Sequence, residues 1–301
     1  MDVIILGGGP GGLSTAFWCA EFGLKAILFE KEIELGGQLL WTFNTITNYL
    51  GIDAITGRDL RDRFLHHIEN KRVHLVTGMQ IVEADLANKT VTLDNGHQIS
   101  ARSFVIATGV SRRNLGVPGE VEFQGRGILD SGARAKGEVA GKTVVIVGGG
   151  NAAIENAAIL SESAGKVILV HRRDMFTARR EFLKRLESAQ NLDIFFNSKV
   201  TEIFGNENAE GARIRNILTG QETSVSANAI LIRTGVEPNN SLFDSQLNFD
   251  SAGYLLVNND LETNVPGVFA VGDIANPKAP TISSSVGMGA RASRSIADSF
   301  A

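Results

Sequence analysis

Cysteine is almost absent from this sequence. Its 301 residues include one, Cys19, so the chain can neither form an intrachain disulfide nor pass electrons through a cysteine pair of its own. Cys19 lies in the middle of a predicted helix over 11–22, and free cysteine is among the most buried residue types. We expect a small buried side chain there. The alternative is a reactive thiol near a bound cofactor.

Other absences narrow the range of functions. No apolar run approaches the ~20 residues of a membrane span, so no membrane partner is expected. The formal net charge is −4 and there is no long basic run, which argues against a nucleic acid or an anionic membrane as partner. The strand 2–7 begins directly after Met1, which leaves no room for a signal peptide and predicts a cytoplasmic protein. No metal site is expected, because four of the five histidines, His66, His67, His74 and His97, show no metal-ligand spacing.

Glycine is abundant, with 33 residues against six prolines. At that level, without a collagen-like period, it indicates tight turns and close approaches of the backbone to ligands. Short apolar strands alternate with amphipathic helices, which predicts a parallel α/β fold. The expected strand–helix–strand cycles are 2–7, 11–22 and 25–30, and then 142–147, 151–163 and 166–171. The β-rich stretches 73–106 and 192–233 are predicted β-meanders.

The two cycles repeat each other. Glu30 follows Gly7 by 23 positions, as His171 follows Gly148, and the β-rich stretches end in Ile106-Ala-Thr-Gly109 and Ile232-Arg-Thr-Gly235. Residues 268–301 begin no third cycle and are expected to complete the first domain. The predicted fold class is therefore α/β, with two Rossmann-like dinucleotide-binding domains, each of three layers. The second domain, 112–244, is inserted in the first, which comprises 1–111 and 245–301.

The first glycine loop runs from Gly7 through Pro10 to Gly12, between a strand and a helix. Gly7 allows the tight turn, Gly9 lets the backbone approach a pyrophosphate, and Gly12 permits close packing of helix and strand. The helix N-terminus offers N–H groups to the phosphates. Glu30, at the end of the next strand, would accept hydrogen bonds from ribose hydroxyls. This combination predicts an FAD site.

The second loop contains Gly148 and Gly150 and has Ala153 in place of the third glycine. Arg172 and Arg173, directly after His171, replace the acid of the first copy. Guanidinium groups clasp a 2′-phosphate that a carboxylate would repel, so this site suits NADP(H). The alternative for the arginines is a solvated cationic face.

A third motif follows the apolar strand 268–271. Asp273, after Gly272, would point into the ligand crevice and bind a hydroxyl group. The small-residue helix that begins near Ser283 would open toward the same crevice.

From end to end, the chain resembles the low-molecular-weight thioredoxin reductases. The matching motifs include both glycine loops, Gly36-Gly37-Gln38, Asn48, Ala107-Thr108-Gly109, Gly125-Arg-Gly127, His171–Asp174, Pro238-Asn239 and Gly272-Asp273. The resemblance implies FAD in the first domain, NADPH in the second and a homodimer. It assigns Lys31, Gly37, Gln38, Asn48, Ala107, Thr108, Gly109, Thr281 and Ile282 to FAD, and Asn151, Ala152, Glu155, Arg179 and Gly235 to the second nucleotide.

The departures from that family are informative. Ser131 and Arg134 align with its two redox cysteines, and Ala135 aligns with the acid that follows them. Similar flavoproteins that reduce bacillithiol disulfide carry a cysteine where Gly11 stands. Thr177 replaces a third phosphate-binding arginine, and Pro280-Thr281 replaces an Arg-Gln pair beside the flavin.

Ser131 and Arg134 are therefore the catalytic candidates. Arg134 would draw an anionic acceptor; the alternative is a solvated helix end in which Asp130 or Ser131 is the N-cap. The predicted function is an FAD-dependent oxidoreductase that takes electrons from NAD(P)H and passes them directly to an unknown acceptor other than thioredoxin. The alternatives are an enzyme similar to ferredoxin- or flavodoxin-NADP reductases, a non-catalytic flavin or nucleotide sensor, and a protein whose second domain holds NADH or another nucleotide, such as a second FAD.

Overall fold

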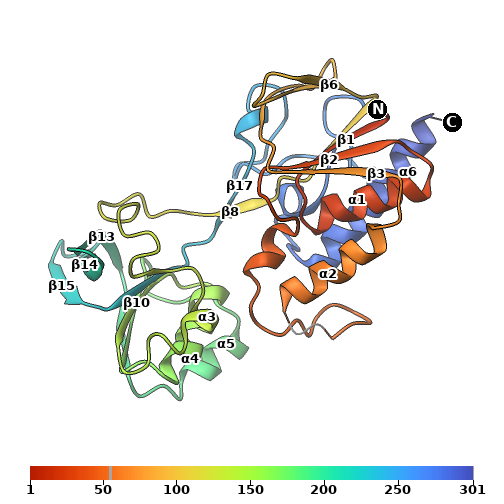
Figure 1. The fold of residues 1–301 in the computed structure, drawn as a ribbon. Helices are drawn as coiled ribbons and strands as arrows, with labels where there is room; N and C mark the ends of the chain where they lie inside the picture. Colours follow the sequence, from red (N-terminus) through yellow and green to blue (C-terminus); the bar gives the residue numbers. More distant parts are fainter. Residues whose placement is uncertain (54–55, 301) are drawn as a thin grey trace. The chain divides into compact units, whose positions relative to one another are not determined.

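The chain folds into two compact units. The computed structural model describes residues 1–53 and 56–300. Unit 1 comprises Met1–Ser111 and Glu237–Ala301, and unit 2 is Arg112–Val236 (Figure 1). The chain returns to unit 1 at Glu237 and not at 245 as the sequence suggested. The reason is that Phe243, which precedes residue 245, is buried in a core of unit 1, and Leu242 packs against the same core. So short a segment carries no local pattern that predicts this burial.

Unit 1 is built on a five-stranded parallel sheet. Its order is β18 (Val268–Ala270), β7 (Ser103–Ile106), β1 (Val3–Leu6), β2 (Ala26–Glu30) and β3 (Val73–Thr77). Helix α1 (Pro10–Glu21) connects β1 to β2. The chain continues from β1 to β2 on one side, whereas β7 and β18 lie on the other. The carboxyl end of β1, where the first glycine loop begins, is therefore the point at which strand order reverses.

Two further layers cover the faces of this sheet. Val3 and Ile5 face a core shared with α1, α2 (Gly57–Ile68) and α6 (Ile282–Phe300). Ile4 and Leu6 face the opposite core, below the antiparallel strands β4 (Ile81–Asp85), β5 (Thr90–Leu93) and β6 (Gln98–Ser100). The predicted meander over 73–106 is thus correct only in its middle. Its ends, β3 and β7, join the parallel sheet, and β7 is buried at all four positions.

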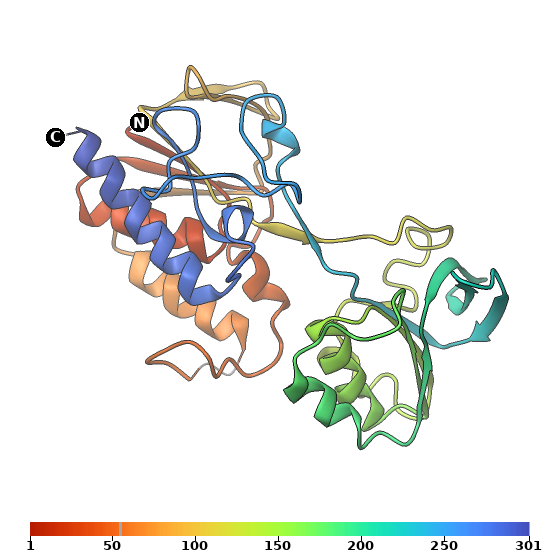
Figure 2. The same cartoon turned by 180° about the vertical axis from the view of Figure 1, so that it is seen from behind.

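The C-terminal helix α6 lies along α1 (Figure 2). Small residues permit this closeness, because a Cβ atom on Gly289 would lie 2.6 Å from the Gly11 carbonyl oxygen. The Ser293 hydroxyl donates to the Thr15 carbonyl oxygen at 3.1 Å. Residues 268–301 therefore complete the first unit, as the sequence predicts. In the described part of the chain, no helix combines the length and the apolar character needed to span a membrane.

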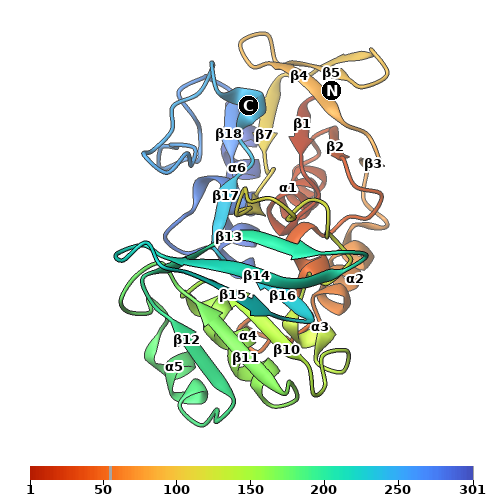
Figure 3. The ribbon, with the colours of Figure 1, turned by 90° about the vertical axis from the view of Figure 1, so that its left-hand side faces the viewer.

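Unit 2 repeats the same three layers. Its parallel sheet has the order β12 (Leu192–Phe195), β11 (Lys166–Val170), β10 (Thr143–Val147), β16 (Ala229–Ile232) and β9 (Ile128–Leu129). The core on one face is shared with the helices α3 (Gly132–Ala135), α4 (Asn151–Ser161) and α5 (Arg180–Leu186). On the other face lie the antiparallel strands β13 (Ser198–Gly205), β14 (Ala209–Asn216) and β15 (Glu222–Ser226) (Figure 3). The predicted class of two Rossmann-like units, the second inserted in the first, is confirmed.

Candidate dinucleotide-binding sites

Two glycines of the first loop are required by the packing of the protein itself. Gly7 has φ +105°, and a Cβ atom there would lie 2.4 Å from the Ala107 carbonyl oxygen. A Cβ atom on Gly12 would lie 1.9 Å from the Gly7 carbonyl oxygen. These contacts give both residues the roles that the sequence suggests, a tight turn and close packing of helix on strand.

Gly9 is different. Its φ is −74°, and the nearest atom to an added Cβ is the Gly37 Cα at 4.0 Å, so nothing in the described protein requires glycine there. As the N-cap of α1, Gly9 has no side chain to bond the first-turn N–H groups, and Pro10 follows at N1. Open space beside free N–H donors fits a pyrophosphate. The loop therefore fits the phosphates of FAD.

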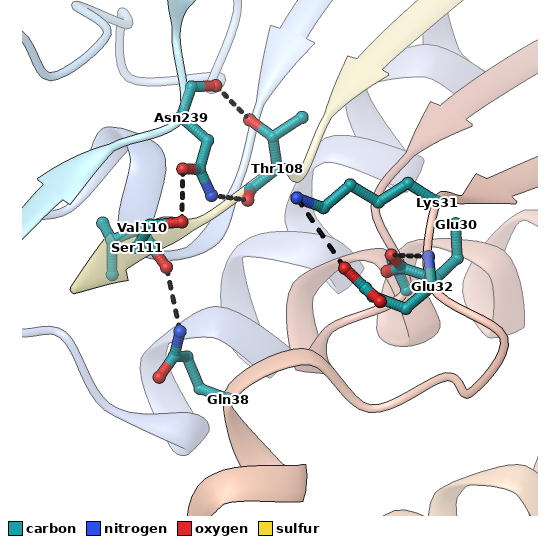
Figure 4. A network of polar contacts seen from close by, with 9 residues as sticks. Glu30, Lys31, Glu32, Gln38, Thr108, Val110, Ser111 and Asn239 are labelled. Carbon is teal, nitrogen blue, oxygen red and sulfur yellow. Dashed lines mark hydrogen bonds and ion pairs between the residues drawn. The ribbon is translucent and has the colours of Figure 1, made fainter. Parts of the chain in front are cut away.

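The Glu30 carboxylate lies against the first glycine loop. Glu30 is 8% exposed, and its carboxylate accepts a hydrogen bond from the Gly8 N–H at 2.7 Å. It also accepts one from the Glu32 N–H at 3.0 Å (Figure 4). In this structure Glu30 therefore fixes the glycine loop, a role that the sequence did not predict. A carboxylate has about four lone-pair sites, so acceptor capacity remains for a ribose hydroxyl. Lys31 is largely exposed, with its ammonium 3.8 Å from the Glu32 carboxylate.

A hydrogen-bonded network holds the segment that follows β7. The Thr108 hydroxyl donates to the Asn239 carbonyl oxygen at 2.9 Å, and the Asn239 amide returns a bond to the Thr108 carbonyl oxygen at 2.8 Å (Figure 4). Ser111 donates to the Asn239 amide oxygen at 2.7 Å, and Gln38 donates to the Val110 carbonyl oxygen at 2.9 Å. Asn239 thus organises residues 108–111. The sequence marks it as part of a motif but gives no sign of this role.

Two further segments that contain predicted FAD residues lie close to the first glycine loop. A Cβ atom on Gly37 would lie 3.0 Å from the Gly9 Cα, and one on Gly11 would lie 3.5 Å from the Gly272 Cα. Segments 36–38 and 272–273 therefore lie against the glycine loop. Asn48 is exposed and lines a surface hollow of about 420 Å³ formed by residues 47–53, which contains no other predicted ligand residue.

Asp273 lies in the short helix η3 (Gly272–Ala275) and is half-buried. Burial raises the pKa of its carboxyl group above the usual value, and a hydrogen bond from the Ser285 hydroxyl partly offsets the shift. Thr281 precedes Ile282, the first residue of α6, and its hydroxyl accepts from the Ser284 N–H at 3.1 Å. Thr281 therefore caps this helix end, while Asp273 offers a poorly solvated acceptor for a ligand hydroxyl.

The second glycine loop has the same arrangement of packed and open glycines as the first. Gly148 has φ +148°, and a Cβ atom there would lie 2.1 Å from the Arg233 carbonyl oxygen. A Cβ atom on Gly150 would meet nothing closer than the Thr177 hydroxyl at 4.0 Å, and Gly150 is the uncapped N-terminus of α4. Ala153 is fully buried on that helix. Space again lies beside free N–H groups, so this loop also fits a pyrophosphate.

Asn151 and Ala152 are exposed in the first turn of α4, and the Asn151 amide oxygen accepts from the Arg179 N–H at 2.8 Å. The Arg179 guanidinium itself lies 3.1 Å from the Glu181 carboxylate and over the Phe182 ring. Two predicted residues, Glu155 on α4 and Gly235 at φ +105°, complete the set in unit 2.

His171 occupies the position of Glu30 and also supports its loop from inside. A Cβ atom on Gly149 would lie 2.3 Å from the His171 ring, and the ring Nε2 is 3.0 Å from the Met175 carbonyl oxygen. Burial lowers the pKa of His171 below its ordinary value, so the ring is neutral at pH 7. The His171 ring therefore supports the loop by packing against it and contributes no positive charge to the site.

Arg172 and Arg173 are exposed. Among residues 1–53 and 56–300, neither guanidinium makes an ion pair or a hydrogen bond. Thr177, which replaces the third arginine of the thioredoxin reductases, holds the loop: its N–H and hydroxyl both donate to the Gly149 carbonyl oxygen, at 2.9 and 3.3 Å. Two uncommitted cations beside the loop suit a 2′-phosphate.

Comparison with known proteins identifies the family of the chain. The family model for pyridine nucleotide-disulphide oxidoreductases matches residues 1–289. The chain belongs to this family. It is an oxidoreductase family whose members bind FAD and use NAD(P)H.

Similar proteins and structures include thioredoxin reductases. A thioredoxin reductase of Mycolicibacterium smegmatis is 33% identical over 279 residues, covering 91% of this chain and 88% of that protein. The crystal structure of Lactococcus lactis thioredoxin reductase has a TM-score of 0.87 at 28% identity, with 99% of this chain and 98% of that one covered. An alkyl hydroperoxide reductase protein from Staphylococcus aureus is 30% identical over 299 residues, and the chain spans 58% of its length.

Within this family the chain has no dithiol of its own. At the position that the resemblance gives to the cysteine pair, Ser131 is the N-cap of α3, and its hydroxyl accepts from the Arg134 N–H at 3.5 Å. The Gly132 N–H donates to the Asn156 amide oxygen at 2.9 Å. The alternative expectation, a capped helix end, thus describes Ser131. Arg134 is exposed on the same short helix.

Cys19 is buried, as expected, and offers no replacement. Burial raises the pKa of its thiol to about 11, and the Ser293 hydroxyl, 3.6 Å away, only partly offsets this shift. Because the thiolate is the reactive form, we expect native protein to be inert toward a disulfide reagent such as DTNB at pH 7. Denatured protein should react at one thiol per chain. Fast stoichiometric reaction of the folded protein would contradict this expectation.

Proposed function

We propose that the protein takes a hydride from NADPH and delivers the two electrons, through FAD held in unit 1, to an external acceptor other than thioredoxin. Bound FAD supplies the redox chemistry, since it accepts a hydride and releases electrons singly or in pairs. We further propose that the protein acts as a cytoplasmic homodimer. The observation that carries the proposal is the pair of glycines, Gly9 and Gly150, whose open space the described protein itself does not need.

The residues of the chain bind and orient the two nucleotides. In unit 1, the N-terminus of α1 would hold the FAD pyrophosphate, while Glu30 and Asp273 would accept hydrogen bonds from its hydroxyl groups. In unit 2, the N-terminus of α4 would hold the NADPH pyrophosphate. Arg172 and Arg173 would hold the 2′-phosphate. Uncommitted guanidiniums favour NADPH over NADH, because only NADPH carries that dianion.

The absence of a cysteine pair from these residues supports direct transfer to the acceptor. Thiol–disulfide exchange requires a thiolate that attacks a disulfide, and Ser131 and Arg134 cannot supply one. Ser131 acts as a helix cap. Arg134, a cation exposed on the same short helix, is the candidate to attract an anionic acceptor.

The test is anaerobic mixing of purified protein with NADPH, followed by assays of several acceptors. We expect FAD, not FMN, among the released cofactors, bleaching of the flavin by NADPH, and turnover with ferricyanide or a quinone. We expect no reduction of thioredoxin in an insulin-coupled assay.

Each step has an outcome that rejects it. Failure of NADPH to bleach the flavin would favour a sensor, and a second FAD per chain would place another nucleotide in unit 2. Robust reduction of thioredoxin by a Cys19→Ala variant would reject the proposed class of acceptor.

A further inference from the structure

Two arginines of unit 2 converge on a single oxygen atom. The Arg112 Nη1 donates to the Asp130 carbonyl oxygen at 2.6 Å, and the Arg233 Nη2 donates to the same oxygen at 2.5 Å. The Arg233 Nη1 also donates to the Ile232 carbonyl oxygen at 2.7 Å. Both side chains are half-buried. Two cationic groups are thus brought together around a neutral acceptor.

This pair lies at the point where the strand order of unit 2 reverses. Arg233 directly follows β16, and its N–H donates at 2.7 Å to the carbonyl oxygen of Val147, the last residue of β10. Its own carbonyl oxygen is the atom that a Cβ on Gly148 would strike. From β10 the sheet runs through β11 on one side and through β16 and β9 on the other. Ligands of open parallel sheets bind at such a reversal.

The loop is therefore flanked by positive charge on both sides. Arg172 and Arg173 follow β11, whereas Arg233 follows β16 and Asp130 follows β9. A dinucleotide centred on Gly148–Gly150 would extend one half toward each side. The half that carries the 2′-phosphate would meet the first pair of arginines, and the other half would approach Arg112 and Arg233.

The charge of Arg233 is incompletely balanced. In the described part of the chain, no carboxylate forms an ion pair with it. Burial and the nearby positive charge of Arg112 lower the pKa of Arg233 to about 10, and the negative charge of Asp130 only partly opposes this shift. Arg233 remains protonated at neutral pH. Two half-buried like charges are unfavourable, and an anion bound between them would relieve the repulsion.

The turn itself does not require arginine. The internal repeat places Ala107 in unit 1 where unit 2 has Arg233, within Ile106–Gly109 and Ile232–Gly235. Ala107 makes the equivalent backbone contact, since its N–H donates to the Leu6 carbonyl oxygen at 2.7 Å and its own oxygen lies against Gly7. The guanidinium is thus an addition to a turn that alanine also builds.

We propose that Arg112 and Arg233 form an anion-binding subsite on the side of the second glycine loop opposite Arg172 and Arg173. The subsite takes a phosphate or carboxylate group. Two sources have this chemistry. One is the phosphate on the nicotinamide side of a dinucleotide, and the other is a separate anionic molecule. The first source rests on the proposed binding of NADPH, whereas the second does not.

The experiment compares Arg233→Met with wild type in the full chain carrying its FAD. Dissociation constants are measured for NADPH and for 2′,5′-ADP, which lacks the nicotinamide half of the dinucleotide. The shift in unfolding temperature caused by inorganic pyrophosphate is measured separately. Arg215→Met, on an exposed position of β14, is the matched control. Arg233→Lys retains the charge without the planar fork, and the unfolding temperature of each variant shows whether it has folded.

We expect Arg233→Met to weaken the binding of NADPH by about ten- to a hundredfold, as for a lost charge-assisted hydrogen bond. The dissociation constant of 2′,5′-ADP should be unchanged. Arg233→Lys should lie between, and Arg215→Met should match wild type. A loss of the pyrophosphate shift with unchanged NADPH affinity assigns the subsite to a separate anion.

Unchanged NADPH affinity together with an unchanged or absent pyrophosphate shift overturns the proposal. Equal weakening of NADPH and 2′,5′-ADP also overturns it, because the arginine then acts on the loop as a whole. If wild type binds no NADPH, the proposed function fails, and the pyrophosphate measurement still decides the subsite.

Discussion

A Gly9→Ala variant is expected to fold as well as wild type and to bind FAD more weakly. A Cβ atom on Gly9 meets no protein atom closer than 4.0 Å, and φ of −74° is ordinary for alanine. The methyl group would instead occupy the space through which a pyrophosphate reaches the N-terminus of α1. Losing a single charge-assisted hydrogen bond there weakens binding by about ten- to a hundredfold.

The matched control is Gly12→Ala, in the same loop. Its Cβ atom would lie 1.9 Å from the Gly7 carbonyl oxygen, so helix and strand must separate. We expect about 3 kcal/mol or more of lost stability, at the upper end of overpacking costs. Chemical denaturation of the apoproteins and titration with FAD separate the two effects. Wild-type FAD affinity in Gly9→Ala would remove this loop from the site.

The double variant Arg172→Met, Arg173→Met is expected to lose its preference for NADPH over NADH. The two guanidiniums are exposed and uncommitted within the described residues, so their removal should leave the fold intact. Loss of contacts to a 2′-phosphate costs about 1.5–3 kcal/mol, which is about ten- to a hundredfold in the dissociation constant of NADPH. NADH carries no such group and should bind as it does to wild type.

Arg215→Met again provides the control for loss of an exposed arginine from unit 2. Dissociation constants for both coenzymes are measured by anaerobic titration. Equal weakening of NADPH and NADH would show that the arginines act only through the general field of the domain. Unchanged discrimination between the coenzymes would exclude them from the site.

Local sequence patterns predict most of the strands and helices. Each strand–glycine loop–helix unit is encoded within about thirty residues, because hydrophobic period, turn glycines and helix start are all local signals. The helix predicted over 151–163 is found at Asn151–Ser161, and the strand predicted over 166–171 at Lys166–Val170. The β-rich stretches were harder to interpret. Whether β7 pairs within a meander or enters the parallel sheet depends on partners distant in sequence, and β7 in fact pairs with β1 and β18.

The sequence by itself determined that this chain has two glycine loops, each between a strand and a helix, and no cysteine pair, since glycine spacing and cysteine number are written directly in it. Only the tertiary structure decided which glycines are open to a ligand. Gly7, Gly12 and Gly148 are blocked by carbonyl oxygens, whereas Gly9 and Gly150 are not. The tertiary structure also places the side chains of Glu30 and His171 against their glycine loops. It brings Arg112 and Arg233, which are far apart in the sequence, to the same carbonyl oxygen. Such contacts depend on how strands pair in space, and no local pattern records that pairing.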